Sequence, residues 1–99
     1  IEFLRNLHDN ALPFSQRTMN IVKNIMVVDD STGFVMRAKS GWGFQNNQDI
    51  GWYVGYIETA DNVYYFANCI QCSSPDNQKF AAARMEIVYS ILRELKIVQ

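Results

Sequence analysis

Three runs rich in aromatic and β-branched residues follow one another with only short polar connections between them. The runs are Phe34–Ala38, Gly51–Glu58 and Val63–Ile70, and side chains of these types favour strands. A polar loop over 44–50 and a turn at Asp61–Asn62 separate them. Parallel neighbours need a crossover of a dozen or more residues, so these connections predict an antiparallel meander of three strands.

Helical spacing marks three further segments, which gives an α+β class with helices flanking the meander. We expect helices over Phe3–Asn10, over about Ser15–Val27 with Ser15 as the N-cap, and over about Gln78–Lys96. Asp29–Gly33 is typical of a turn. The apolar positions expected to face the core are Met19, Val22, Ile25 and Met26 in the second helix, and Phe80, Ala83, Ile87, Val88, Ile91, Leu92 and Leu95 in the third.

The composition limits the classes of function that the chain can serve. Its 99 residues are 48% hydrophobic, enough for one core of modest size, so we expect residues 1–99 to form a single, partial domain. Nine basic and ten acidic residues give a net charge of -1. Without a basic stripe we expect no nucleic-acid partner. The longest apolar run, Ile25–Val28, is far shorter than the ~20 residues of a membrane-spanning helix, so we expect no span.

The first residues favour a segment of a longer parent. Ile1–Leu4 carries no start methionine, no charged leader region and no cleavage pattern. Phe3, Leu4 and Leu7 already have helical spacing. We therefore expect the chain to be a fragment.

A basic residue, a hydroxyl and two glycines come together at Lys39-Ser40-Gly41-Trp42-Gly43, where the run Phe34–Ala38 ends. Glycine has no side chain that would keep a ligand away from the backbone. The motif therefore predicts an anion-binding edge at the exit of a strand. Strict alternation sends Lys39 and Ser40 to opposite faces, and an edge strand on which the lysine stem curls over the rim would reconcile them.

Arg84 is unusual in the third helix because it precedes Ile87 by three residues and Val88 by four, and therefore shares their packing face. A guanidinium there needs an anion, a carboxylate or water to offset its desolvation. One interpretation is an arginine that lays its stem over the core and keeps its head in water. The other places it beside Lys39 and Ser40, around one small anionic ligand.

Other polar candidates carry weaker signals. Cys69 and Cys72 form a lone C-x-x-C at a strand end, with too few ligands for structural zinc and no helix start for a redox pair. We expect two small apolar residues in a buried strand, and we expect His8 to lie on the surface at a helix end. Glu58 and Asp61 flank a turn, where solvation is commoner than acid–base work. No metal or cofactor is implied.

Four aromatic residues lie close to the motif, in or beside the predicted strands: Trp42, Trp52, Tyr53 and Tyr56. Such side chains can form a platform for a sugar or a peptide. They also line cores and grooves, which is the commoner use of aromatics at strand spacing, so we expect them to pack.

Taken together, these residues resemble the C-terminal part of class D β-lactamases, the oxacillinases, within the penicillin-recognising serine enzymes. The similarity runs through Lys39–Trp42, Gly51–Glu58, Val63–Ala67 and Arg84, and through the earlier run from Phe3 to Lys23. It covers nearly the whole chain. It implies the C-terminal half of the serine β-lactamase/transpeptidase fold.

The resemblance also implies a mechanism and a set of roles. In that family an activated serine attacks the β-lactam carbonyl, and water activated by a carbamylated lysine hydrolyses the acyl-enzyme. Lys39 would be the catalytic lysine, acting electrostatically and as a proton relay. Ser40 would hydrogen-bond the substrate carboxylate and Arg84 would clamp it. Gly41 belongs to the same substrate-binding strand, and the backbone N–H of Trp42 would supply half of the oxyanion hole.

The chain departs from the family because it lacks the nucleophile box Ser-x-x-Lys. It also lacks Ser-x-Val and Tyr-Gly-Asn. We therefore expect that this chain alone neither acylates nor hydrolyses a penicillin. Its expected partners are a β-lactam and the missing N-terminal half of the parent domain. An extracytoplasmic location, periplasmic or secreted, follows from the resemblance only.

Two other functions stay open. One is the penicillin-sensor domain of the β-lactam resistance signal transducers, which resembles the same strands, although Arg84 favours the hydrolase. The other is a non-catalytic structural or interaction domain. In either case an open sheet edge in the isolated chain would favour a homo-oligomer.

Overall fold

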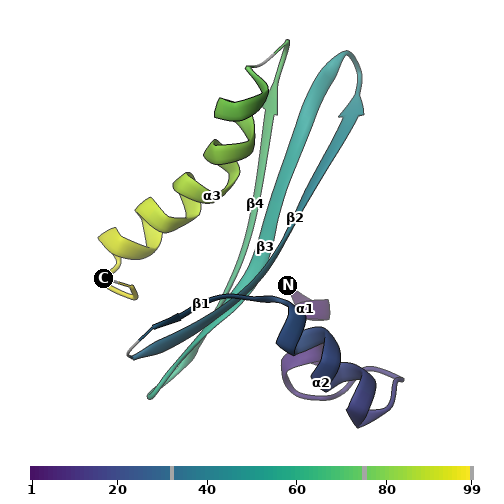
Figure 1. The fold of residues 1–99 in the computed structure, drawn as a ribbon, viewed down its shortest axis with the longest axis vertical. Helices are drawn as coiled ribbons and strands as arrows, with labels where there is room; N and C mark the ends of the chain where they lie inside the picture. The colour runs from purple at the N-terminus through teal and green to yellow at the C-terminus, as the bar shows by residue number, and fades with distance from the viewer. Residues whose placement is uncertain (32, 75, 99) are drawn as a thin grey trace. The chain divides into compact units, whose positions relative to one another are not determined.

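The computed structural model describes residues 1–31, 33–74 and 76–98, and it confirms the α+β class with one strand more than expected. Helices accompany one four-stranded antiparallel sheet (Figure 1). The elements are α1 (Glu2–His8), α2 (Gln16–Ile25), β1 (Val27–Ser31), β2 (Phe34–Gln45), β3 (Gln48–Thr59), β4 (Val63–Cys72) and α3 (Asn77–Glu94).

The additional strand is β1, and it occupies residues where the sequence predicted the end of a helix and a turn. α2 ends at Ile25, and Val27–Ser31 pairs antiparallel with the first residues of β2. The turn expected over 29–33 was therefore wrong for residues 29–31, while Thr32 lies outside the described residues. Two adjacent aspartates make this strand hard to predict from the sequence, because Asp is depleted in strands and only the pairing with β2 overrides that preference.

The strands lie in the sheet in chain order, β1-β2-β3-β4, which confirms a meander. A two-residue turn at Asn46 and Asn47 joins β2 to β3, and both residues have a positive φ, of 55° and 61°. Asn tolerates this conformation better than most residues, and two such residues in a row match the twist of a hairpin. The loop expected over 44–50 is therefore a shorter turn, and both strands extend into it.

Contacts divide the chain into two compact units. Unit 1 comprises Ile1–Ala38 and Gly55–Phe66, and unit 2 comprises Lys39–Val54 and Ala67–Gln99. Unit 2 therefore contains the Lys-Ser-Gly motif together with α3. The buried hydrophobic side chains are Leu4, Leu7, Met19, Met26, Met36, Ala38, Tyr56 and Ile57 in unit 1, and Tyr53, Phe80, Val88, Leu92 and Val98 in unit 2.

In unit 1, α2 begins where the sequence predicted. The Ser15 hydroxyl accepts a hydrogen bond from the backbone N–H of Thr18 at 3.1 Å, which confirms the N-cap. Met19 and Met26 are buried as expected. Ile25, however, is 77% exposed, so its assignment to the packed face was wrong. It is the last residue of the helix, where no further turn extends the packed stripe.

In unit 2, α3 runs alongside β4 (Figure 1). Asp76 caps the helix by accepting a hydrogen bond from the backbone N–H of Lys79 at 3.0 Å. The side-chain amide of Asn68 on β4 donates to the carbonyl of Arg84 at 3.0 Å. The buried stripe differs from the predicted one because apolar residues occur on more than one face of α3, so spacing alone could not choose between the faces. Phe80, Arg84, Val88 and Leu92 are buried, whereas Ile87, Ile91 and Leu95 are exposed.

β4 is an edge strand of the sheet, which corrects the expectation of a buried strand. Every residue from Val63 to Cys72 keeps part of its surface exposed. Cys69 and Cys72 are free and exposed, so the prediction that they are buried was wrong. An edge strand has a pairing partner on one side only, and the sequence pattern of aromatic residues does not report which strand lies at the edge.

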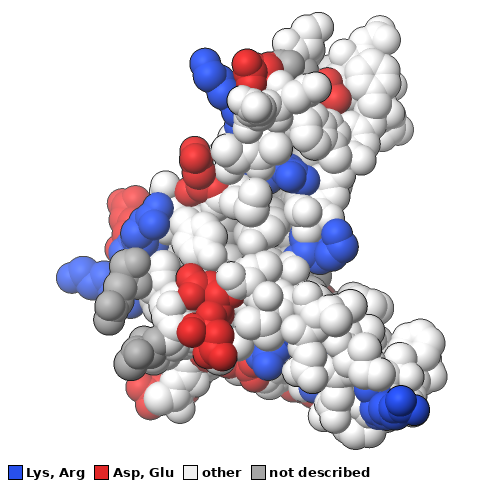
Figure 2. Space-filling model, in the orientation of Figure 1, with Lys and Arg blue, Asp and Glu red and all other residues white. Residues whose placement is uncertain are grey.

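The surface carries both charges. In the view of Figure 2, Lys and Arg atoms are interspersed with Asp and Glu atoms. Within the described residues, no helix combines the length and the apolar character that crossing a membrane requires.

Candidate functional site

Arg84 is held on the packing face of α3, as its spacing predicted. The residue is only 9% exposed. Its Nη1 donates to the carbonyl of Gly41 on β2 at 3.1 Å, and its Nε donates to the carbonyl of Ala81 at 3.2 Å. The structure therefore brings Arg84 and the Lys-Ser-Gly strand together, although they are far apart in the sequence.

The indole ring of Trp42 lies beside this guanidinium. The Arg84 Cζ lies 5.5 Å from the centroid of the indole ring, within the range of a cation–π contact. The ring also packs against Phe80, with 5.0 Å between ring centroids. At its edge, the indole Nε1–H donates to Oδ1 of Asp49 at 3.0 Å. The aromatic residue is thus fixed by contacts from both β3 and α3.

Gly51 on β3 supplies the space through which the arginine stem passes. A Cβ built on Gly51 would lie 2.8 Å from Arg84 Cδ and 2.9 Å from Phe80 Cε2. Real Cβ atoms do not approach carbon so closely, so any other residue here would displace the arginine or the phenylalanine. This glycine serves close packing, because its φ is not among the positive ones.

Lys39 and Ser40 lie within β2 and not at its exit, which corrects the predicted end of the strand. Lys39 is exposed and its Nζ donates to the backbone carbonyl of Ser40 at 3.0 Å, while Ser40 is half-buried. Pairing with β1 ends at Arg37, which lies opposite Val27. Beyond that point β2 has no β1 neighbour, and the lysine stem turns back to its own strand.

Not all of the predicted site residues contact one another. Among the described residues, no hydrogen bond or ion pair joins Lys39 or the Ser40 hydroxyl to Arg84. Gly41 and Trp42 contact Arg84 directly. The arginine is therefore tied to the second half of the motif.

The charge on Arg84 lacks a carboxylate partner in the part of the chain that the structure describes. Two carbonyl oxygens and an aromatic ring face it instead. A buried cation compensated only by dipoles keeps part of its desolvation cost. The remaining donors of its planar fork are the groups that could hold a carboxylate.

Tyr53 shares this environment on β3. Burial raises the pKa of the Tyr53 phenol, the neighbouring Tyr89 raises it further, and the Arg84 charge lowers it. The neutral phenol is therefore the form that the folded chain favours here.

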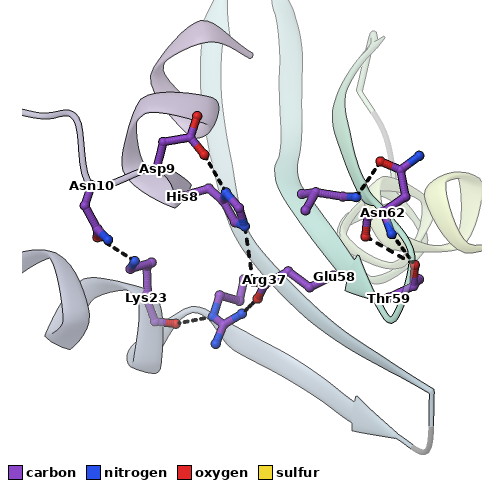
Figure 3. Close-up of polar contacts among 9 residues, drawn as sticks. His8, Asp9, Asn10, Lys23, Arg37, Glu58, Thr59 and Asn62 are labelled. Carbon is purple, nitrogen blue, oxygen red and sulfur yellow. Dashed lines mark hydrogen bonds and ion pairs between the residues drawn. The ribbon is translucent and has the colours of Figure 1, made fainter.

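A second polar cluster lies in unit 1 and is drawn in Figure 3. Arg37 forms an ion pair with Glu58, and its Nε donates to the carbonyl of Lys23 at 3.1 Å. His8 lies 3.2 Å from Oε2 of Glu58 through Nε2, and 2.8 Å from Oδ1 of Asp9 through Nδ1. His8 ends α1 as predicted, and both side chains stay partly exposed, but each also has a partner from another element that neither spacing nor turn position reveals.

Tyr56 contacts two members of this cluster. Its ring packs edge-on against His8 at 5.3 Å between centroids, and the Arg37 Cζ lies 5.9 Å from its centroid. The hydroxyl is buried without a hydrogen-bond partner among the described residues. Burial raises the pKa of Tyr56, the charge on Arg37 lowers it, and Tyr65 raises it. Next to Arg37 and Glu58, a polar hollow of about 300 Å³ is also lined by Asn20, Lys23 and Asn24.

The described residues include no group of three or more His, Cys, Asp or Glu side chains arranged to hold a metal ion. The arrangement in unit 2 instead offers a buried guanidinium beside a glycine-containing strand, which is the chemistry of carboxylate recognition.

Residues 4–93 match the model of the penicillin-binding protein transpeptidase domain. The chain therefore belongs to this family. This finding confirms the resemblance that the Lys-Ser-Gly strand and its neighbours indicated.

Relatives of this family match along nearly the whole chain or all of it. β-Lactamase OXA-48 of Klebsiella pneumoniae is 35% identical over 98 residues, which cover 99% of this chain and 36% of the relative. The crystal structure of a class D β-lactamase from Sebaldella termitidis is 38% identical with a TM-score of 0.92, covering 100% of this chain and 40% of that one. The C-terminal domain of the Bacillus licheniformis BlaR penicillin-receptor is 31% identical with a TM-score of 0.85, covering 100% and 39%.

The chain therefore spans two fifths or less of the length of these relatives.

Two residues around the site were not predicted from the sequence. Asp49 lies in a stretch of polar residues that looked like a loop, and Gly51 looked like the start of a strand. A signal for Gly51 existed, because glycine within a strand often marks close approach of another group.

Proposed function

We propose that this chain is the carboxylate-binding part of a class D-like serine β-lactamase, which binds and hydrolyses β-lactam antibiotics when intact. The observation that carries the proposal is Arg84, a buried guanidinium hydrogen-bonded to the Gly41 carbonyl and bordered by Trp42. A β-lactam of the penicillin type carries a carboxylate, and a planar guanidinium binds that group with two parallel hydrogen bonds.

Each predicted site residue has one role in this proposal. Arg84 binds the carboxylate together with the Ser40 hydroxyl. Lys39 acts as the electrostatic and proton-relay lysine. Gly41 lets the ligand approach the strand, and the backbone N–H of Trp42 donates to the oxyanion that develops during acylation. The nucleophile is expected from outside residues 1–99, since the sequence has no Ser-x-x-Lys.

A chimera tests the proposal directly. The aligned 40% of the Sebaldella termitidis enzyme is replaced by this chain, and hydrolysis of benzylpenicillin is followed. We expect turnover, and we expect Lys39→Ala to slow acylation while Arg84→Met mainly raises KM. A folded chimera that neither binds nor opens benzylpenicillin would refute the proposal. The isolated chain is the matched control, and a covalent penicillin adduct on it would contradict the expected need for an external nucleophile.

A penicillin sensor is the second candidate, and a relative of that kind supports it beside the hydrolases. Regulatory protein BlaR1 of Bacillus licheniformis is 33% identical over 93 residues, covering 93% of this chain and 15% of the relative. A sensor keeps its acyl-enzyme, whereas a hydrolase releases it. Rapid acylation followed by stable stoichiometric labelling of the polypeptide that contains this chain would favour the sensor. Continued turnover would favour the hydrolase.

Domain extent, location and assembly are further parts of the proposal. Residues 1–99 would form one segment of a penicillin-recognising domain, acting outside the cytoplasm as the family resemblance implies. The edge position of β4 supports pairing with a further strand, either from the rest of the parent domain or from a second copy. A non-catalytic interaction domain remains the alternative if no β-lactam binds.

A further inference from the structure

Two residues on one face of β3 lie close either to the Arg84 side chain or to the tryptophan beside it. Asp49 and Gly51 are two residues apart, so alternation places them on the same side of the strand. Gly51 faces the arginine, since a Cβ there would lie 2.8 Å from Arg84 Cδ. Asp49 faces the indole of Trp42 and accepts its N–H at 3.0 Å.

Trp42 contacts both Asp49 and the Arg84 guanidinium. The Arg84 Cζ lies 5.5 Å from the centroid of the indole ring, and the ring rests on Phe80. Trp42 is exposed, so packing alone constrains it only in part. A hydrogen bond at the edge of an indole restricts both side-chain torsions, which keeps the ring beside its neighbour.

We propose that Asp49 and Gly51 are positioning residues for the Arg84 guanidinium. Asp49 orients the Trp42 ring that borders the guanidinium, and Gly51 leaves the space that the arginine stem crosses. The inference rests on the proposed function, because it takes Arg84 as the group that binds the carboxylate of the ligand. Neither residue acts on the reacting atoms, so their effect falls on the affinity for the ligand.

The first test measures capture of benzylpenicillin by the whole polypeptide that contains this chain, separating the dissociation constant from the acylation rate constant. Asp49→Ala weakens the affinity by about threefold to tenfold, the range of one hydrogen bond. Gly51→Ala weakens it by about tenfold or more, because it displaces the guanidinium itself. Asp49→Asn keeps an acceptor oxygen for the indole and restores the affinity. Asp61→Ala removes an exposed carboxylate at the turn before β4, and it serves as the matched control.

A double-variant cycle separates positioning from general destabilisation. In the Arg84→Met background, Asp49→Ala causes no further loss of affinity, since the group that it positions is gone. An equal loss in both backgrounds would overturn the inference. A loss confined to the acylation rate constant would overturn it as well.

NMR of the whole polypeptide that contains this chain gives a readout that needs no activity. Asp49→Ala shifts the indole N–H resonance of Trp42 and the side-chain Nε–H resonance of Arg84, and Asp49→Asn restores the arginine resonance. An unchanged Arg84 resonance in Asp49→Ala would overturn the inference. If Arg84→Met leaves the benzylpenicillin affinity unchanged, the proposed function fails; if only Arg84→Met weakens it, the positioning inference alone fails.

Discussion

Two arginines, one in each unit, are placed in similar surroundings and compensated differently. Arg37 has a side chain that is 17% exposed, and it pairs with Glu58, which also contacts His8. Arg84 is 9% exposed as a whole residue, and two backbone carbonyls and an indole face it. The first arginine is part of a completed structural network. The second carries a charge that an added carboxylate would still stabilise, which is the property expected of a ligand-binding group.

The largest predicted change in stability comes from breaking the completed network. Glu58→Ala leaves Arg37 with a part-buried charge and no carboxylate, so the free energy of unfolding should fall by about 2 kcal/mol. Urea denaturation followed by circular dichroism measures the change. Asp61→Ala serves as a control without an ion pair in the described residues. A fall below about 0.5 kcal/mol would contradict the view of Arg37 and Glu58 as a stabilising pair.

A smaller change of opposite sign is expected beside the same network. Tyr56→Phe removes a buried hydroxyl that has no hydrogen-bond partner among the described residues. Removing an unsatisfied polar group while keeping the ring should stabilise the chain by up to about 1 kcal/mol. Thermal unfolding of the two chains compares them. Destabilisation by Tyr56→Phe would show that the hydroxyl has a partner in solution.

Alkaline titration compares the two arginines through their tyrosine neighbours. Burial raises the pKa of both Tyr53 and Tyr56 above the ordinary value of 10.0, while Arg84 and Arg37 respectively lower it. The pKa of each phenol is higher in the folded chain than in the unfolded chain. The stability that the neutral phenols contribute is therefore complete below pH 10.0, and it is lost as the pH rises through the folded-state pKa.

Each arginine should therefore affect its own tyrosine. Arg84→Met should raise the pKa of Tyr53, and Arg37→Met should raise that of Tyr56, as followed by tyrosinate absorbance. If the tyrosines titrate identically in both variants and in the unchanged chain, the two arginine charges do not act on their tyrosine neighbours, and this prediction is wrong.

The smallest stability change is expected at Arg84, for which ligand binding is proposed. Arg84→Met keeps the stem that crosses Gly51 and removes a charge without a carboxylate partner in the described residues, so the free energy of unfolding should change by less than about 1 kcal/mol. Urea denaturation beside Glu58→Ala makes the comparison. A loss as large as that of Glu58→Ala would show that the Arg84 charge stabilises the fold, as the Arg37 charge does.

Local signals predicted the elements well where one force dominated. The N-cap at Ser15, the meander and the packing-face position of Arg84 were confirmed, because capping, turn length and helical spacing depend on neighbouring residues. β1 was missed because its two aspartates disfavour strands and only pairing with β2 stabilises it. The exposed Ile91 was misplaced because α3 has more than one apolar face.

The sequence by itself determined the class of the fold and the family, and it predicted which residues bind an anion. It did so because motifs and periodicity are properties of short stretches of chain. The tertiary structure decided which cation has a carboxylate partner among the described residues, placing Glu58 against Arg37, and backbone carbonyls and an indole ring against Arg84. It also decided that Asp49 and Gly51 border the arginine. These relations depend on contacts between elements distant in sequence, and such contacts form only when strands and helices pack.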